Sequence, residues 1–258
     1  MLETGVDSRR IDAVCRRLSD PVQVAKSKQL PFRFLSAYRE IEDISNFNTN
    51  AIMAALEKAV KASAANIDGF DDNTRVLIAS DVSGSMWTSI SDRSKVRYYD
   101  IGLLLSMIFR YSCKQVISGI FGDEWKPVNL PGNDILYATS QLANIANSVG
   151  YSTNGHKVIS WLLNNNIVVE KVMMFTDLQM WDSKGEKKRI NDLWKRYRKI
   201  APKARIYLFD LAGYGNTPLQ LRENGVFLIG GWSDRIFEVL NAIENGATAL
   251  SVIKSTQL

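Results

Sequence analysis

In the segment Asp81-Val-Ser-Gly-Ser85, a carboxylate and two hydroxyls occupy every second position. This spacing suits the binding of a cation. The segment follows residues 75–80, an apolar run with β-branched side chains that is typical of a fully buried strand. Asp81, Ser83 and Ser85 therefore leave a strand end together, and a loop can turn them toward one point. Such oxygen ligands suit a hard cation like Mg²⁺, which binds through few carboxylates. A strand-to-turn junction whose serine caps a helix shows the same pattern.

Two further polar positions fall at the ends of predicted elements. Asp177 ends the apolar strand predicted over residues 171–177, and Thr153 lies in a loop just before a predicted helix. In an open α/β sheet, ligands bind beyond the carboxyl ends of the strands, and two carboxylates meeting there repel unless a cation separates them. The sequence therefore predicts a site for Mg²⁺, or for Mn²⁺ or Ca²⁺. Its expected ligands are Asp81, Ser83, Ser85, Thr153 and Asp177, with helix capping as the alternative role for Thr153.

The elements that position these residues alternate between strands and helices from Val76 onward. This order predicts an α/β fold: a doubly wound, mostly parallel sheet, Rossmann-like, with helices on both faces. Strands are predicted over residues 76–80, 116–121, 171–177, 205–211 and 226–229, with a short edge strand over 126–130. Helices are predicted over residues 95–111, 134–149, 156–164, 187–200 and 234–244, the last with Ser233 as its N-cap.

An α-helical segment precedes the sheet region. Residues 1–20 have helical spacing that stops before Pro21, and a basic connection is expected through Lys26 and Lys28. Residues 50–65 are Ala-rich and predict a strong helix, followed by a turn over 66–73. The predicted division is therefore a helical segment over residues 1–70 and a sheet domain over 71–258.

Positive charge is concentrated in one stretch of the chain. The net charge is +5, yet residues 184–205 alone contain ten Lys and Arg against Glu186 and Asp192. Such a stripe can bind RNA or another polyanion, and the alternative is the solvated outer face of an amphipathic helix. Trp194 and Tyr197 fall on the predicted inner face, so they are not expected to stack on bases. The candidate anion-binding residues are Lys187, Lys188, Arg189, Lys195, Arg196, Arg198 and Lys199.

The sequence offers little for catalysis or for a membrane. His156 is the single histidine, read as an exposed or helix-capping residue, and Asp123 and Glu124 have no evident partner. A binding protein is therefore expected rather than an enzyme, with a metal-dependent phosphohydrolase as the least favoured alternative. Cys15 and Cys113 look like isolated thiols, which suits the cytoplasm, and no apolar run approaches the ~20 residues of a membrane span.

The motif Asp81-Val-Ser-Gly-Ser85, the later Thr153 and the strand end Phe175-Thr-Asp177 resemble the metal-ion-dependent adhesion site of von Willebrand factor A domains. In that family the serines and the threonine ligate a metal ion, and the aspartates bind it directly or through water. An open position takes a carboxylate or another anionic oxygen from a partner. The resemblance implies these roles for the five candidate ligands. The family often has Gly-Gly-Thr where this chain has Tyr151-Ser-Thr153, so a stiffer loop is expected here.

A narrower resemblance covers the N-terminal part. Lys28-Gln-Leu-Pro-Phe-Arg-Phe-Leu-Ser-Ala-Tyr-Arg39, then an Ala-rich helix and the sheet region, resemble the C-terminal portion of Ro autoantigen (TROVE) proteins. Those proteins bind noncoding RNAs with a preceding ring of helical repeats. This chain has no room for the ring, so we expect a domain of a longer protein or a relative without the ring. The resemblance implies a metal-dependent binding module of an RNA-binding protein, with a protein partner that supplies an acidic residue. RNA binding through residues 184–205 without metal is the second hypothesis.

Overall fold

A computed structural model describes residues 8–246, apart from 66, 68, 93, 180–185, 214, 216–218, 220–224 and 232–234. The described residues form a six-stranded sheet with the strand order β3-β2-β1-β4-β5-β6. All neighbouring strands are parallel except β2 and β3, so the antiparallel pair closes one edge. In spatial order the strands are β3 Trp125–Pro127, β2 Gln115–Phe121, β1 Arg75–Asp81, β4 Lys171–Thr176, β5 Arg205–Asp210 and β6 Val226–Gly230.

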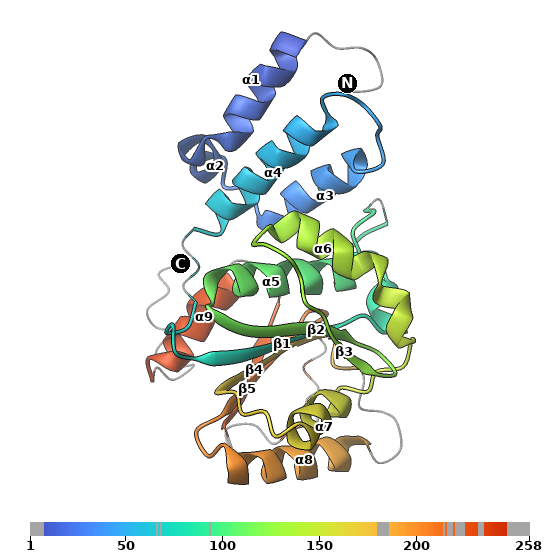
Figure 1. Cartoon of the computed structure of the whole chain (residues 1–258), viewed down its shortest axis with the longest axis vertical. Helices are drawn as coiled ribbons and strands as arrows, with labels where there is room; N and C mark the ends of the chain where they lie inside the picture. Colours follow the sequence, from blue (N-terminus) through green and yellow to red (C-terminus); the bar gives the residue numbers. More distant parts are fainter. Residues whose placement is uncertain are drawn as a thin grey trace.

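Helices cover both faces of this sheet, as Figure 1 shows. One face carries α5 (Tyr98–Ser112), α6 (Ile135–Asn144) and α9 (Arg235–Glu244), and the other carries α7 (His156–Asn164) and α8 (Glu186–Ile200). Successive strand residues point to opposite faces, so each face has its own apolar core. The predicted doubly wound, mostly parallel α/β fold is therefore confirmed.

Most predicted elements are present, and the largest changes of boundary are the following three. The helix predicted from residue 95 begins at Tyr98, because Ser89 and Arg97 pair as an isolated bridge and Arg97 has an extended backbone before the helix. The helix predicted to residue 149 ends at Asn144, and a 3₁₀ turn, Ala146–Val149, follows it. The edge strand lies at Trp125–Pro127 rather than at 126–130. The N-cap predicted at Ser233 lies outside the described residues.

Four helices precede the sheet: α1 Ser8–Ser19, α2 Pro21–Ser27, α3 Pro31–Ile41 and α4 Thr49–Ser63. The basic connection predicted through Lys26 and Lys28 was wrong, since Pro21 begins a second helix instead of only ending the first. Proline is well tolerated at the first helical position, and Asp20 caps this helix by accepting hydrogen bonds from the N–H groups of Val22 and Gln23.

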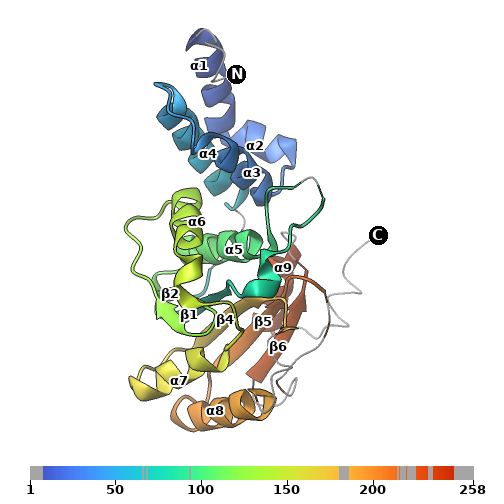
Figure 2. The same ribbon diagram turned by 90° about the vertical axis from the view of Figure 1, so that its right-hand side faces the viewer.

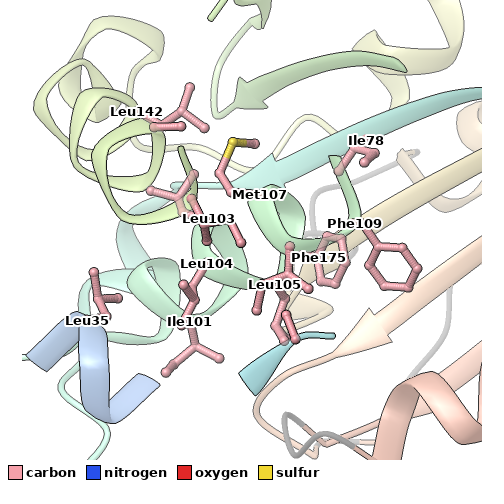
Figure 3. Packing of buried hydrophobic residues seen from close by; sticks show 14 of the residues in the cluster. Leu35, Ile78, Ile101, Leu103, Leu104, Leu105, Met107, Phe109, Leu142 and Phe175 are labelled. Atoms are coloured by element: carbon pink, nitrogen blue, oxygen red, sulfur yellow. The ribbon is translucent and has the colours of Figure 1, made fainter. Parts of the chain in front are cut away.

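The N-terminal helices pack on the α5 and α6 layer, as Figures 1 and 2 show. Leu35 of α3 joins the same apolar cluster as Ile101 and Leu104 of α5, and Figure 3 shows it beside that part of α5. Glu57 of α4 also accepts hydrogen bonds from the backbone N–H groups of Ile135 and Leu136, at 2.5 and 2.9 Å, and so caps α6. The helical segment thus shares a core with the sheet region, and the division at residue 70 remains a prediction.

Candidate metal centre

Asp81 is the last residue of β1 and is fully buried. One carboxylate oxygen accepts a hydrogen bond from the backbone N–H of Ser83 at 2.9 Å. The other accepts one from the Thr176 hydroxyl on β4 at 2.7 Å. β1 and β4 are the central strands where the chain order reverses, so this carboxylate sits at the position where open α/β sheets bind ligands.

The electrostatic surroundings of Asp81 disfavour its charged form. The pKa of Asp81 is raised from 3.8 to about 7, mainly by burial and also by the charge of Asp177, while hydrogen bonds from Ser83 and Thr176 oppose the shift. A buried carboxylate with a second carboxylate nearby is a costly arrangement for a metal-free protein. A divalent cation between the two groups would favour the charged form of both.

Ser83 and Ser85 lie in a tight turn directly after β1. Ser83 is fully buried, Ser85 is half-buried, and their hydroxyl oxygens are 3.5 Å apart. Adjacent ligands of an octahedral Mg²⁺ lie about 3 Å apart, and those of Ca²⁺ about 3.5 Å apart, given the metal–oxygen distances of these ions. The turn continues into a 3₁₀ helix, Gly84–Trp87, and the Trp87 indole N–H donates to the carbonyl of Val82 at 2.9 Å. The serine pair is thus fixed at a spacing that suits a hard cation.

Asp177 follows β4 and is 2% exposed. Its carboxylate accepts a hydrogen bond from the backbone N–H of Gln179 at 3.0 Å. Leu178 has a φ of 61°, a conformation uncommon for a residue with a side chain, and its N–H donates to the Thr176 hydroxyl at 3.1 Å. The chain therefore turns sharply after the strand, which keeps Asp177 at the sheet edge beside Asp81.

The loop that carries Thr153 is joined to the serine turn. The Gly84 N–H donates to the carbonyl of Tyr151 at 2.8 Å. From the end of β2, Asp123 accepts a hydrogen bond from the Ser152 N–H at 2.7 Å. Thr153 is half-buried, and within the described part of the chain its hydroxyl makes no hydrogen bond. The structure thus ties this loop to the same sheet edge as the other candidate ligands, and the role of Thr153 remains a prediction.

The donor set fits a hard cation that uses hydroxyls as well as carboxylates. The site contains two buried carboxylates, and its other candidate ligands are hydroxyls. Among the described residues, no group of three or more His, Cys, Asp or Glu side chains is arranged to hold a metal. A cation bound here would therefore keep several waters, or an oxygen from a ligand, in its coordination shell.

Three residues at this edge were missed in the sequence. Thr176 holds the second oxygen of Asp81, and Asp123, for which no partner is evident in the sequence, holds the Thr153 loop. Asp210 at the end of β5 is 1% exposed and accepts hydrogen bonds from the N–H groups of Gly213 and Gly215. The signal that could have identified Thr176 and Asp210 is a hydroxyl or carboxylate at the last position of a parallel strand.

His156 was interpreted wrongly as an exposed or capping residue. It is the first residue of α7, yet it is 2% exposed and packs inside the protein. Its neighbours Gly155 and Val158 are buried as well, so the helix begins below the surface. A buried imidazole two residues after the Thr153 loop is poorly placed to exchange protons with a solvent-exposed substrate.

The basic stripe is partly as expected. Arg189, Lys195, Arg196 and Lys199 are exposed on α8, while the Lys187 and Lys188 side chains lie outside the described residues. Arg198 is half-buried and donates to the carbonyl of Ala204, so it holds the α8–β5 connection. Trp194 and Tyr197 are each 1% exposed, which confirms that they belong to the core.

The comparisons with known proteins concern the fold. No protein-family model matches the sequence, and no curated protein matches it. The crystal structure of the Deinococcus radiodurans Ro (RSR) protein superimposes with a TM-score of 0.65 at 20% identity, over 95% of this chain and 50% of that chain. The resemblance to Ro proteins is thereby confirmed at the level of the fold. This chain has the fold of about half of a Ro protein.

Proposed function

We propose that this chain is a metal-dependent binding module of a Ro-type RNA-binding protein. The observation that carries the proposal is a pair of buried carboxylates, Asp81 and Asp177, at the ends of the paired strands β1 and β4, beside two serine hydroxyls 3.5 Å apart. Mg²⁺ is the expected ion, with Mn²⁺ and Ca²⁺ as alternatives. Its open coordination position would take a carboxylate of a protein partner or a phosphate oxygen.

Each residue has a distinct part in this proposal. Ser83, Ser85 and Thr153 would supply hydroxyl oxygens, while Asp81 and Asp177 would supply negative charge directly or through water. Thr176 and the Ser83 N–H hold the Asp81 carboxylate in place. The bound cation would supply positive charge for an anionic ligand.

The wider context of the proposal is a noncoding-RNA-binding protein. The fold likeness to the Deinococcus radiodurans Ro protein supports it, and this chain spans about half the length of that protein. We propose binding rather than catalysis, because the single histidine is buried.

The described residues contain no helix long and apolar enough to cross a membrane. The free thiols Cys15 and Cys113 support a cytoplasmic location.

A second candidate function is RNA binding by the exposed cations of α8 without metal. Arg189, Lys195, Arg196 and Lys199 lie on the outer surface of that helix. Phosphate contacts of this kind weaken steeply as salt rises, whereas binding at the metal would be lost in EDTA. Replacing Lys195, Arg196 and Lys199 with Gln would therefore separate the two candidates in an RNA-binding titration.

The direct test is a thermal melt in EDTA and in excess Mg²⁺ or Mn²⁺. A metal present at about 100 times its dissociation constant stabilises by roughly 2.7 kcal/mol, which corresponds to about 5–10 °C for a chain of this size. We expect this rise for the wild type and its loss for Asp81→Asn, which keeps the shape of the side chain but lacks its charge.

Asp210→Asn is the matched control, because it changes a second buried carboxylate at the same sheet edge. Its melting temperature is expected to fall both with and without metal, while the rise caused by Mg²⁺ remains. A metal-dependent rise that persists in Asp81→Asn would refute the proposed site.

A further inference from the structure

Three aromatic rings and one guanidinium form a cluster beside the serine turn. The ring centroids of Trp87 and Tyr99 are 5.1 Å apart. The centroids of Trp87 and Tyr151 are 5.9 Å apart, and these two rings meet edge to face. The Arg97 guanidinium lies 4.9 Å from the centroid of Trp87 and 5.9 Å from that of Tyr99. Tyr99 is buried and Trp87 is half-buried, but Tyr151 is 59% exposed. The cluster therefore presents one open aromatic ring at the surface.

This ring is held against the candidate metal centre. The Tyr151 carbonyl accepts the Gly84 N–H at 2.8 Å, and a Cβ added to Gly84 would lie 3.8 Å from the Cβ of Tyr151. Gly84 separates Ser83 from Ser85, so Tyr151 adjoins the two serine ligands. The Tyr151 hydroxyl also donates to the side-chain carbonyl oxygen of Asn147 at 3.2 Å, which fixes the far end of the ring.

We propose that Tyr151 and Arg97 select the ligand of this centre, and that the ligand is a nucleotide. Its phosphate would reach the cation, and its base would stack on the exposed ring of Tyr151. This inference rests on the proposed metal site and goes further by naming the chemical class of the ligand. Tyr151 is the specificity-determining residue, and Arg97 adds positive charge that attracts the phosphate.

The chemistry of the cluster favours a nucleotide over an acidic peptide. A peptide carboxylate needs the cation alone, whereas a base needs a flat, open ring beside it, and Tyr151 provides one. Trp87 and Asn147 fix this ring in advance, so stacking on it costs little side-chain freedom. Arg97 adds a second positive charge, which suits a phosphate that carries more than one negative charge.

The test compares adenosine monophosphate with ribose 5-phosphate in the presence of Mg²⁺. The two probes share the phosphate ester, and only the first has a base. We expect the wild type to bind adenosine monophosphate more tightly, and Tyr151→Ala to weaken that binding by about 5- to 150-fold, the range measured for stacking of one base on an aromatic side chain. Binding of ribose 5-phosphate should change little in this variant.

Two further variants sharpen the result. Tyr151→Phe keeps the ring and should retain the preference for the base, while Arg97→Gln should weaken both probes alike, because it removes charge. Tyr137→Ala, which removes an exposed tyrosine from α6, is the matched control and should bind as the wild type does.

The outcomes separate this inference from the proposed metal site. A Mg²⁺-dependent melting shift together with equal binding of the two probes would overturn the inference and leave the metal site intact. A Mg²⁺-dependent complex with an acidic peptide that is insensitive to Tyr151→Ala, without nucleotide binding, would also overturn it. Loss of the melting shift itself would refute the proposed function.

Discussion

At the scale of single residues, the site depends on burying a carboxylate that the fold does not neutralise. Among the described residues, the hydrogen-bond partners of Asp81 are the Ser83 N–H and the Thr176 hydroxyl, and neither carries a charge. These two bonds orient the carboxylate, but burial still raises its pKa from 3.8 to about 7. A residue whose charged form is unfavourable without a ligand is typical of functional sites.

This shift predicts how stability depends on pH in EDTA. Because the pKa of Asp81 is higher in the folded protein than in the unfolded chain, the folded state holds an extra proton between about pH 4 and 7. The stabilisation that this proton gives the folded state is complete below pH 4 and is lost as the pH rises through 7. The free energy of unfolding should fall by up to about 1.4 kcal/mol per pH unit in this window.

Urea unfolding of the wild type and Asp81→Asn across this window measures the effect. Asparagine does not titrate, so the variant should show a shallower decline, and the difference between the two curves isolates Asp81 from the other carboxyl groups. Parallel curves would contradict a raised pKa for this residue.

At the scale of elements, the parallel sheet brings the two carboxylates together, but a side chain positions the Thr153 loop. Asp123 accepts the Ser152 N–H, and its main-chain carbonyl accepts the side-chain N–H of Asn154 at 3.0 Å. Gly150 has a φ of 77°, and a Cβ there would lie 2.0 Å from an Asp123 oxygen, so glycine allows this close approach.

Asp123→Ala is therefore expected to release the loop and weaken metal binding. Loss of a residue that orients a metal ligand typically costs 10- to 100-fold in affinity, and about tenfold is expected here because the loop keeps its bond to Gly84. The measurement is a Mg²⁺ or Mn²⁺ titration followed by melting temperature. Glu124→Ala is the control, since it removes only a solvent-exposed ion pair with Lys157. Equal affinities in the two variants would exclude the role given to Asp123.

At the scale of the whole molecule, a polar network joins the N-terminal helices to the sheet layer. Arg39 of α3 forms ion pairs with Asp100 of α5 at 2.8 Å and with Glu42 at 3.0 Å, and Glu42 accepts a hydrogen bond from Ser140 of α6. Burial raises the pKa of Asp100, and Arg39 opposes that shift. Asp100 also accepts the Arg97 N–H, so the network reaches the loop beside the metal centre.

We therefore expect the helical segment and the sheet to unfold together. All six tryptophans follow residue 86, so tryptophan fluorescence reports on the sheet region, whereas circular dichroism at the helix band also reports on the N-terminal helices. The two signals should change at the same urea concentration. Arg39→Met should lower that midpoint for both, because it leaves a nearly buried carboxylate without its ion pair, at a cost of roughly 3 kcal/mol. Separate transitions in the wild type would instead show two independent units.

The α/β architecture could be predicted from the sequence alone, and so could the positions of the main candidate ligands at one edge of the sheet. Apolar runs such as residues 171–176 can be buried on both faces, and their alternation with helical patterns leaves a parallel sheet as the solution. A carboxylate at the end of such a run must lie at the carboxyl edge, which is why Asp81 and Asp177 could be placed together in advance. The second helix, in contrast, was missed because Pro21 was taken only as the end of the first helix, although Asp20 followed by Pro21 is a typical helix start.

Contacts between distant segments could be seen only in the three-dimensional structure. The hydrogen bond from Thr176 to Asp81 spans two strands, and the capping of α6 by Glu57 joins residues on two different helices. The burial of His156 and the contact between Tyr151 and Trp87 arise in the same way. Local spacing fixes the direction of a side chain within its own element, while its neighbours follow from how the elements pack, and no local pattern encodes those neighbours.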